Sequence, residues 1–128
     1  MIDDNAVTWI AAKLGLQPIN ILELVTFYPM LREKSAGKTH IRVCRTLSCA
    51  MAGSYRVMEN LCAATGIERK IDRNGMHTPV SVSADGNYSI EFVECLASCG
   101  TAPVMMCNES FYEGVSEKRA EEILWECK

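Results

Sequence analysis

Two pairs of closely spaced cysteines constrain the fold of this chain more than any other feature of its sequence. Cys44 and Cys49 have four residues between them in "VCRTLSCA", and Cys95 and Cys99 have three between them in "VECLASCG". Each pair directly follows a segment with strand character, and α/β folds commonly place their sites at the ends of strands. A fold that uses both pairs together must bring two loops, distant in the sequence, to one edge of a sheet.

The first cysteine pair lies between a predicted strand and a predicted helix. In "THIRVCR", residues 39–45, Ile41 and Val43 alternate with polar residues, which predicts a strand. A helix is expected to begin near Ala50 and to end at Gly66, because apolar residues recur at helical spacing between them. The residues that define this helical face are Met51, Tyr55, Met58 and Cys62.

The chain after residue 66 predicts strands followed by one helix. Turn signals at Asn74-Gly75 and Asp85-Gly86 surround "MHTPVSVS" and "YSIEFVE", which predicts two strands paired as a hairpin. "VMMCNESFYEG" predicts a further short strand and a turn, and Ser116 is a suitable cap for a last helix. The resulting order, β-α-β-β-α, predicts a small α/β sandwich.

The first part of the chain predicts a pair of helices. Apolar residues recur at helical spacing up to Gly15, and a second helix begins at Pro18 and ends at Pro29. A polar connection, residues 32–38, follows. We therefore expect a helical region over residues 1–37 and an α/β domain over residues 38–128.

The composition narrows the expected partners and location. Apolar residues make up 48% of the 128 residues, the net charge is −3, and lysines and arginines do not cluster, so nucleic acid is not an expected partner. The most apolar stretch, residues 19–31, contains Asn20, Glu23 and Pro29 and is shorter than the roughly 20 residues that cross a bilayer. Because the N-terminus does not resemble a signal peptide, we expect a soluble intracellular protein without membrane insertion.

Seven cysteines leave several kinds of site open. Their odd number and the lack of an export signal make a secreted disulfide framework a poor fit. The alternatives are four buried apolar cysteines, a structural zinc site, a thiol–disulfide exchange enzyme and an iron–sulfur cluster. Exchange enzymes use a C-x2-C pair, which the sequence lacks, and common zinc knuckles use shorter gaps. Two separated pairs favour a [2Fe-2S] cluster, in which each iron takes two thiolates, without settling the choice.

The sequence around the cysteines resembles one protein family. "TFYPML" and "GKTHIRVCRTLSCAMAGSYRVMENL", followed by "VECLASCGTAPVMMCNESFYEGVS", are similar to the 24-kDa subunit of respiratory NADH dehydrogenase (complex I). They are also similar to the small subunits of NAD-reducing hydrogenases and NAD-dependent formate dehydrogenases. The resemblance runs from residue 18 to the last helix. Family members usually carry a longer helical N-terminal region than this chain, whereas the stretch "ERKIDRNGMHTPVSVS", residues 68–83, is longer here than in the family.

The resemblance implies a fold, a cofactor and a partner. The fold would be a helical N-terminal region followed by a thioredoxin-like [2Fe-2S] ferredoxin domain. Cys44 and Cys49 would bind one iron of the cluster, and Cys95 and Cys99 would bind the other. The chain would exchange single electrons with the FMN of a partner flavoprotein that oxidises NADH. The larger oxidoreductase complex would be cytoplasmic, and peripheral to the inner face of the membrane in the case of complex I.

The sequence suggests no catalytic residues. It contains neither a G-x-G-x-x-G motif nor a P-loop, so the isolated chain is expected to be an electron carrier without a substrate site. The apolar helix "NILELVTFYPML" is expected to supply part of the surface that docks the flavoprotein. A stand-alone thioredoxin-like [2Fe-2S] ferredoxin and a structural zinc module remain open as alternatives.

Backbone groups near the cysteines are expected to support a cluster. N–H groups in loops 45–48 and 96–100 can offset the negative charge of the thiolates. Gly53 and Gly100 are expected to let the backbone approach the cluster closely. Two positions are expected as alternatives for the Arg45 side chain: a hydrogen bond to a cysteine sulfur, or a solvated place on the surface.

Other conspicuous residues are expected to be structural. Pro103 stands where thioredoxin-like folds often have a cis-proline, so a cis Ala102–Pro103 bond is predicted. Packing positions are expected for Cys62, Cys107 and Cys127. The methionines expected to fill the core are Met51, Met58, Met105 and Met106. Both histidines, His40 and His77, are expected to be structural or surface residues.

Overall fold

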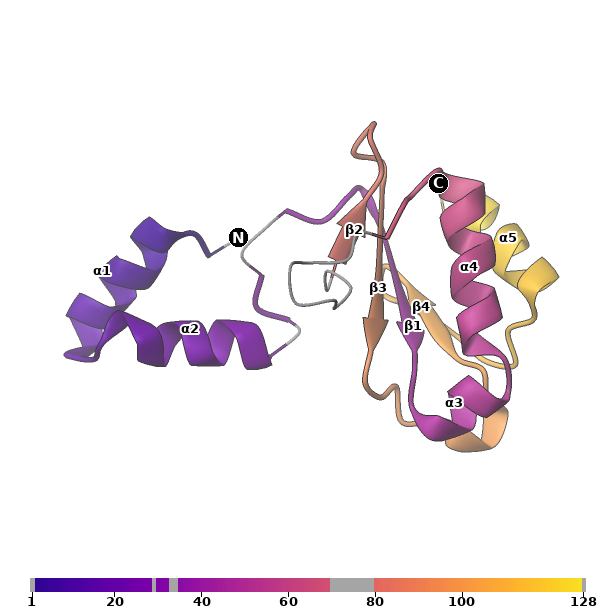
Figure 1. Cartoon of the computed structure of the whole chain (residues 1–128), viewed down its shortest axis with the longest axis horizontal. Helices are drawn as coiled ribbons and strands as arrows, with labels where there is room; N and C mark the ends of the chain where they lie inside the picture. Colours follow the sequence, from indigo (N-terminus) through magenta and orange to yellow (C-terminus); the bar gives the residue numbers. More distant parts are fainter. Residues whose placement is uncertain (1, 29, 33–34, 70–79, 128) are drawn as a thin grey trace. The chain divides into compact units, whose positions relative to one another are not determined.

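A computed structural model of the chain describes residues 2–28, 30–32, 35–69 and 80–127. It contains two compact units, Met1–Ser35 and Ala36–Lys128. The first unit is helical, and the second contains a five-stranded sheet (Figure 1). The expected turn at 74–75, the first half of "MHTPVSVS" and His77 lie outside the described residues.

The first unit consists of helices α1 (Asp4–Leu14) and α2 (Pro18–Phe27), as predicted. The Asp3 side chain caps α1 by accepting a hydrogen bond from the Ala6 N–H at 2.8 Å, and Gly15 ends this helix with φ +66°. The two helices share a small apolar core formed by Val7, Ala11, Ile21 and Val25.

The surface of this helical unit carries large exposed apolar side chains. On α2, Leu24 is 49% exposed and Phe27 is 76% exposed, although Ile21 and Val25 of the same helix are buried. In the described part of the chain, no single helix is long and apolar enough to cross a membrane. Helices α1 and α2 are long and apolar enough for this only when they are counted together, and the pair is bent by 119° between them.

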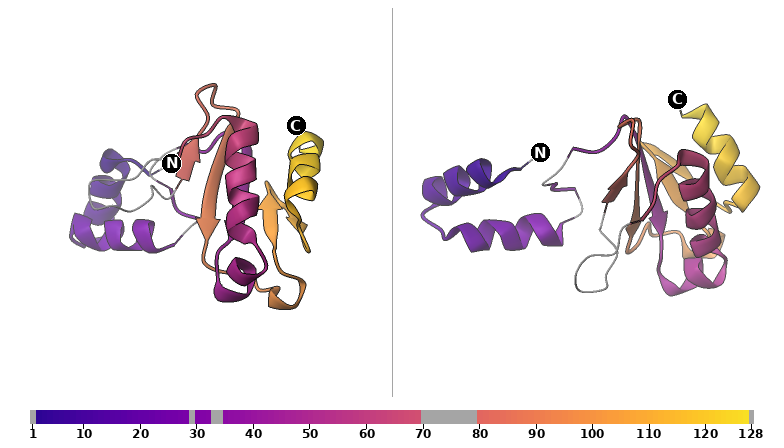
Figure 2. Two further views of the ribbon diagram at one scale, coloured as in Figure 1. Left: turned by 45° about the vertical axis from the view of Figure 1, so that its right-hand side comes forward. Right: turned by 45° about the horizontal axis from the view of Figure 1, so that its top comes forward.

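The second unit is built on a sheet with the strand order β2-β3-β1-β4-β5 (Figures 1 and 2). Strands β1 and β3 are parallel, and the other neighbouring strands are antiparallel. The predicted α/β class is confirmed, and "VMMCNESFYEG" forms two strands, so a hairpin is added to the expected order. The strands are β1 (Thr39–Cys44), β2 (Val80–Val82), β3 (Tyr88–Val93), β4 (Met105–Cys107) and β5 (Ser110–Tyr112).

Helices α4 (Ser54–Thr65) and α5 (Glu117–Glu126) cover one face of this sheet (Figure 2). Ile41 and Val43 of β1 point into the resulting core and are fully buried, as their alternation predicted. Burial of each aliphatic side chain contributes about 1.5–3 kcal/mol, so this layer holds β1 firmly in place. The core also contains Val57, Met58, Leu61, Ile90, Met105, Cys107, Ala120, Ile123 and Leu124.

The helical segment after β1 is split, unlike the single helix predicted from the sequence. A short helix, α3 (Leu47–Met51), precedes α4, and Gly53 between them has φ +106°, which glycine adopts without a steric penalty. Because this break resets the helical phase, Met51 is 80% exposed, and its expected core position was wrong. Met58 and Met105 are buried, as predicted.

His40 belongs to a buried polar network between β1 and β3. Its Nδ1 lies 2.6 Å from the Ser89 hydroxyl, and its Nε2 lies 2.7 Å from Glu91 Oε1. All three residues are buried. His40 therefore has a structural role, which is one of the two roles expected for it.

Gly37 gives a prediction about the stability of this unit. A Cβ at this position would lie 2.5 Å from the carbonyl carbon of Tyr88 and 2.8 Å from the Ser89 nitrogen. Because these are backbone atoms, we expect Gly37→Ala to lower the free energy of unfolding by about 1–3 kcal/mol. Urea unfolding measures this, with Lys38→Ala at the exposed neighbouring position as the control. Equal stability of the two variants would refute the close approach.

Candidate functional site

Parallel pairing of β1 and β3 brings the two cysteine loops to the same edge of the sheet. Cys44 ends β1 opposite Val93, which ends β3 two residues before Cys95. The Arg45 N–H donates to the Val93 carbonyl at 3.0 Å, and the Cys44 N–H donates to the Val104 carbonyl at 3.2 Å. The fold therefore places the two loops side by side.

The two cysteine pairs differ in exposure. Cys44 and Cys49 are 2% and 1% exposed, whereas Cys95 and Cys99 are exposed to solvent. The buried pair belongs to a small apolar cluster that also contains Val104, with Leu96 and Ala102 packed against it. Because these three residues come from the second loop, that loop covers the buried pair while its own cysteines face outward.

The Cys44 sulfur lies 3.2 Å from the Thr46 hydroxyl and 3.9 Å from the Glu94 carbonyl, to which its thiol donates. Burial raises the pKa of Cys44, but hydrogen bonds from the Thr46 side chain and N–H, the Cys49 thiol and the Leu96 N–H outweigh it and lower the pKa overall. The Leu96 N–H belongs to the second loop. The contact between the loops therefore stabilises negative charge on the first cysteine pair.

Cys49 responds to its surroundings in the opposite direction. Burial raises its pKa, as do its hydrogen bond to Cys44 and the negative charges of Cys44 and Cys99, whereas a hydrogen bond from the Val104 N–H acts against them. The pKa of Cys49 is raised overall. Since Cys99 influences Cys49, the exposed pair interacts electrostatically with the buried pair. A cation held between these thiols would favour their ionised forms.

The backbone between Cys95 and Cys99 directs an N–H group at sulfur. Ala97 has φ +58°, a conformation that costs a non-glycine residue about 1–2 kcal/mol, and its N–H donates to Cys95 Sγ at 3.2 Å. A short 3-10 helix, Cys99–Thr101, follows. The Ala102–Pro103 peptide bond after it is cis, as predicted.

Glu113 anchors this second loop, although no sequence motif points to it. Its Oε1 accepts hydrogen bonds from the hydroxyls of Ser98 and Thr101, both at 2.6 Å. These bonds hold the pKa of the Glu113 carboxyl below its usual value. The Gly114 N–H adds a hydrogen bond to the Thr101 carbonyl at 2.7 Å. No spacing pattern links Glu113 to these hydroxyls, because the link depends on the path of β4 and β5.

Arg45 forms a surface ion pair, which decides between its two expected roles. Its Nε donates to Glu94 Oε1 at 2.8 Å, and its Nη2 contacts the same oxygen. Arg45 follows Cys44 and Glu94 precedes Cys95, so the pair ties one loop to the other. Both side chains are substantially exposed, and such pairs contribute at most about 1 kcal/mol.

The two glycines expected to approach a cluster have different surroundings. Gly53 provides the break between α3 and α4, and a Cβ there would meet only the Arg56 side chain, at 3.5 Å. A Cβ at Gly100 would meet no protein atom within 4 Å. The packing of the protein itself therefore does not require glycine at position 100.

The four described loop cysteines are not gathered around a single point. Within the ranges that the structure describes, no three side chains of His, Cys, Asp or Glu are grouped so that they could hold one metal ion. The sulfur interactions instead connect Cys44 with Cys49, and Cys49 with Cys99. Cys95 forms its hydrogen bond with its own loop.

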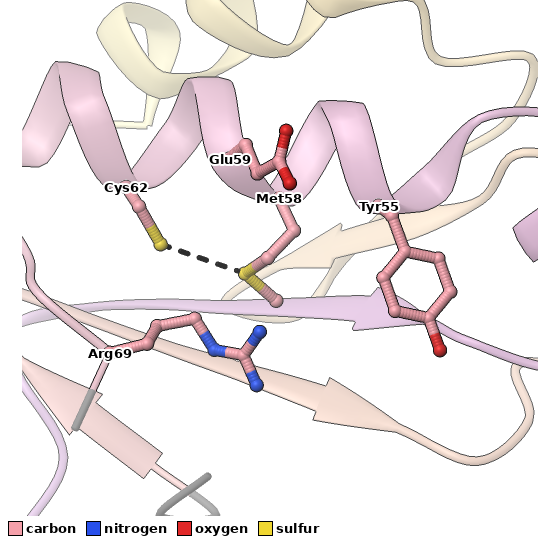
Figure 3. A pocket seen from close by; sticks show the side chains of 5 residues that line it. All are labelled: Tyr55, Met58, Glu59, Cys62 and Arg69. Atoms are coloured by element: carbon pink, nitrogen blue, oxygen red, sulfur yellow. Dashed lines mark hydrogen bonds between the residues drawn. The ribbon is translucent and has the colours of Figure 1, made fainter. Parts of the chain in front are cut away.

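A groove of about 290 Å³ beside α4 is lined in part by Cys62 (Figure 3). The Cys62 Sγ lies 3.8 Å from Met58 Sδ, and burial raises the pKa of this thiol, with partial compensation by the Arg69 charge. The Arg69 guanidinium lies 4.7 Å from the centre of the Phe92 ring. Cys62 therefore occupies a packing position, as predicted. The groove is lined by Tyr55, Met58, Glu59, Cys62 and Arg69.

Comparison with known sequences gives a family and several relatives. A family model described as thioredoxin-like [2Fe-2S] ferredoxin matches residues 1–128. The chain is 36% identical over 116 residues to NADH-quinone oxidoreductase subunit 2 of Thermus thermophilus, which covers 90% of this chain and 59% of that protein. It is 31% identical over 119 residues to a subunit of the NADH-quinone oxidoreductase of Rickettsia bellii. This match covers 93% of this chain and 65% of that protein. The chain thus spans less than two thirds of these relatives.

Comparison with solved structures gives the same fold. The structure of an NAD+-reducing [NiFe]-hydrogenase in the H2-reduced state matches with a TM-score of 0.72 at 18% sequence identity. The match covers 98% of this chain and 20% of the hydrogenase chain. At this level of identity the similarity concerns the fold.

Proposed function

Because the chain belongs to the thioredoxin-like [2Fe-2S] ferredoxin family, we propose that it is an electron-transfer subunit that binds one [2Fe-2S] cluster. Cys44 and Cys49 hold one iron, and Cys95 and Cys99 hold the other. The observation that carries the proposal is the meeting of the two cysteine loops at one edge of the sheet, where Leu96 and Ala102 pack against the cluster of the buried cysteines and the Cys44 N–H donates to the Val104 carbonyl at 3.2 Å.

The donor set suits a cluster of this kind. Two thiol pairs match two irons that each take two thiolates, and backbone donors reduce the cost of placing negative charge at a buried position. When bound, the cluster supplies one-electron redox chemistry. The protein's own contribution is to bury Cys44 and Cys49 beneath the second loop and to leave Cys95 and Cys99 at the surface. A redox partner would approach from the exposed side.

The partner in this proposal is a flavoprotein that carries FMN and oxidises NADH, within a larger oxidoreductase complex. The relatives of this chain in Thermus thermophilus and Rickettsia bellii, which are subunits of NADH-quinone oxidoreductase, support this. The complex lies in the cytoplasm or at the inner face of the membrane. In this proposal residues 1–37 form the helical docking region, and residues 38–128 form the cluster domain.

The exposed side chains of α2 provide the test of docking. Replacing Leu24 and Phe27 together by serine should abolish co-purification with the flavoprotein, because about half or more of each side chain is available to a partner. The cluster spectrum should not change. Trp125→Ser, at an exposed aromatic position on α5, is the matched control and should retain the flavoprotein. Retention by the α2 variant would refute the docking role.

The absorption and electron paramagnetic resonance spectra of protein purified without oxygen test the cofactor. The proposal expects a coloured protein with two irons per chain and a signal on reduction. A colourless protein that contains zinc would instead establish the structural zinc module. A cluster protein that never associates with an FMN protein would establish the stand-alone ferredoxin. Insulin reduction by the purified chain would establish the thiol–disulfide exchange enzyme.

Gly100 offers a prediction that separates the cofactor from the fold. Gly100→Ala should change the free energy of unfolding by no more than about 0.5 kcal/mol, since its Cβ meets no protein atom. The substitution should nevertheless weaken or shift the cluster spectrum, because position 100 directly follows Cys99 and the backbone there is expected to approach the cluster. An unaltered spectrum would show that this approach is not close.

A further inference from the structure

Strand pairing brings Glu113 to the edge of the sheet where the two cysteine loops meet. Met105 of β4 pairs with Val43 of β1 on one side and with Tyr112 of β5 on the other. Since Cys44 directly follows Val43, and β5 runs in the same direction as β1, the residue after Tyr112 arrives at the end of the sheet that carries the cysteines. That residue is Glu113.

The Glu113 side chain links residues on both sides of Cys99. Its Oε1 accepts hydrogen bonds from the hydroxyl of Ser98, which precedes Cys99, and from the hydroxyl of Thr101, which follows it by two residues. Both distances are 2.6 Å, and the two hydroxyls lie 2.8 Å from each other. Hydrogen bonds to an ionised acceptor are roughly twice as strong as neutral ones. One carboxylate oxygen therefore holds together the segment that presents the Cys99 thiol.

The backbone after Glu113 connects the same segment to the rigid part of the domain. The Gly114 N–H donates to the Thr101 carbonyl at 2.7 Å, and the Val115 N–H donates to the Pro103 carbonyl at 2.9 Å. Val115 is itself buried in the core beneath the helices. Because these links do not involve the Glu113 side chain, a substitution at position 113 removes the contact to the hydroxyls and leaves the path of the backbone in place.

The carboxyl group of Glu113 also contributes a negative charge to this segment. Its hydrogen bonds to Ser98 and Thr101 hold its pKa below the usual value, so it is ionised at neutral pH. Within the described ranges of the chain, no lysine or arginine forms an ion pair with it. The charge of Glu113 is therefore not neutralised by a neighbouring side chain, unlike that of Glu94, which pairs with Arg45.

We propose that Glu113 is a positioning residue for the exposed half of the cluster site, which holds the segment that presents Cys99 and lowers the reduction potential through its charge. This inference rests on the proposed function, since it concerns the [2Fe-2S] cluster of that proposal. Net charge and hydrogen bonding around a cluster tune its potential, and a nearby negative charge disfavours the addition of an electron. Loss of a partner outside the ligand set typically weakens metal binding about 10–100-fold.

Two substitutions separate the hydrogen bonds of Glu113 from its charge. Glu113→Gln keeps an oxygen that can accept from both hydroxyls but removes the charge, whereas Glu113→Ala removes both. Iron release is measured on the full-length protein, purified without oxygen, as the loss of visible absorption in excess EDTA. Glu113→Ala should release iron about tenfold faster than the wild type. Glu113→Gln should stay within about twofold of the wild-type rate, because its hydrogen bonds are retained.

The reduction potential measures the charge, which a purely structural role would not affect. Both variants should have a more positive potential than the wild type in a redox titration followed by electron paramagnetic resonance. We expect the ratio of reduced to oxidised cluster at a fixed potential to rise about threefold, which corresponds to about 28 mV for one electron. The matched control is Glu109→Gln, which removes the same charge from the exposed turn between β4 and β5, at the opposite end of this hairpin. It should change neither the release rate nor the potential.

The outcomes distinguish this inference from the proposed function. Iron release from Glu113→Ala at the wild-type rate, or equally fast release from Glu113→Gln and Glu113→Ala, would show that the hydrogen bonds do not hold the segment. A wild-type potential in Glu113→Gln, or an equal shift in Glu109→Gln, would show that the charge at position 113 has no specific effect. Each of these results, obtained with a wild type that carries the cluster, overturns the inference and leaves the proposed function intact. A wild type without a reducible cluster refutes the proposed function, and the inference with it.

Discussion

Serine in place of Cys44, Cys49, Cys95 or Cys99, one at a time, is expected to reduce the cluster signal at least tenfold. Loss of one thiolate leaves an iron with three of its four sulfur ligands, and even residues outside the ligand set change metal affinity by about 10–100-fold. Iron content and the electron paramagnetic resonance spectrum of the reduced protein measure the effect. Cys62→Ser should keep the full signal, because this thiol lies in the groove beside α4.

The stability of the metal-free protein should separate these four variants into two groups. Cys44 and Cys49 are buried in an apolar cluster, so a serine hydroxyl there should lower the free energy of unfolding by about 1–3 kcal/mol. Cys95 and Cys99 are exposed, and their replacement should change it by no more than about 0.5 kcal/mol. A full cluster signal in Cys95→Ser or Cys99→Ser would refute the assignment of the second iron.

His40→Ala is expected to lower the free energy of unfolding by about 3 kcal/mol. The substitution removes the imidazole that contacts Ser89 at 2.6 Å and Glu91 at 2.7 Å. The buried Glu91 carboxyl group then loses its hydrogen-bond partner on β1. Removal of one partner of a buried hydrogen bond typically costs about 1–3 kcal/mol, and more where the remaining group is charged. Urea unfolding at neutral pH measures the loss.

A double variant distinguishes the loss of the pair from the loss of packing. His40→Leu combined with Glu91→Leu replaces both members by apolar groups, which is often close to neutral for buried pairs. The double variant should therefore be more stable than His40→Ala. If His40→Ala costs less than about 0.5 kcal/mol, the network makes little contribution to stability and this account of His40 is wrong.

Local features of the sequence were sufficient to predict most of the secondary structure. Gly15 ends α1 as its position in the sequence predicted, and the alternation of Ile41 and Val43 predicted both the strand and its buried face. These predictions succeeded because capping and alternation depend on neighbouring residues. The prediction for Met51 failed because Gly53, which has a left-handed conformation, interrupts the helix. Side chains before this break therefore do not share a face with those of α4, and Met51 is exposed.

The order of the residues was enough to predict the helical pair, the α/β class and the two loops in which cysteines follow strands, because each depends on residues close together in the chain. Only the folded chain shows which groups from distant segments come into contact. There the Cys44 N–H donates to the Val104 carbonyl, and Glu113 Oε1 accepts hydrogen bonds from the hydroxyls of Ser98 and Thr101. These contacts follow from the order and the path of the strands, and the spacing of residues in the sequence does not encode them.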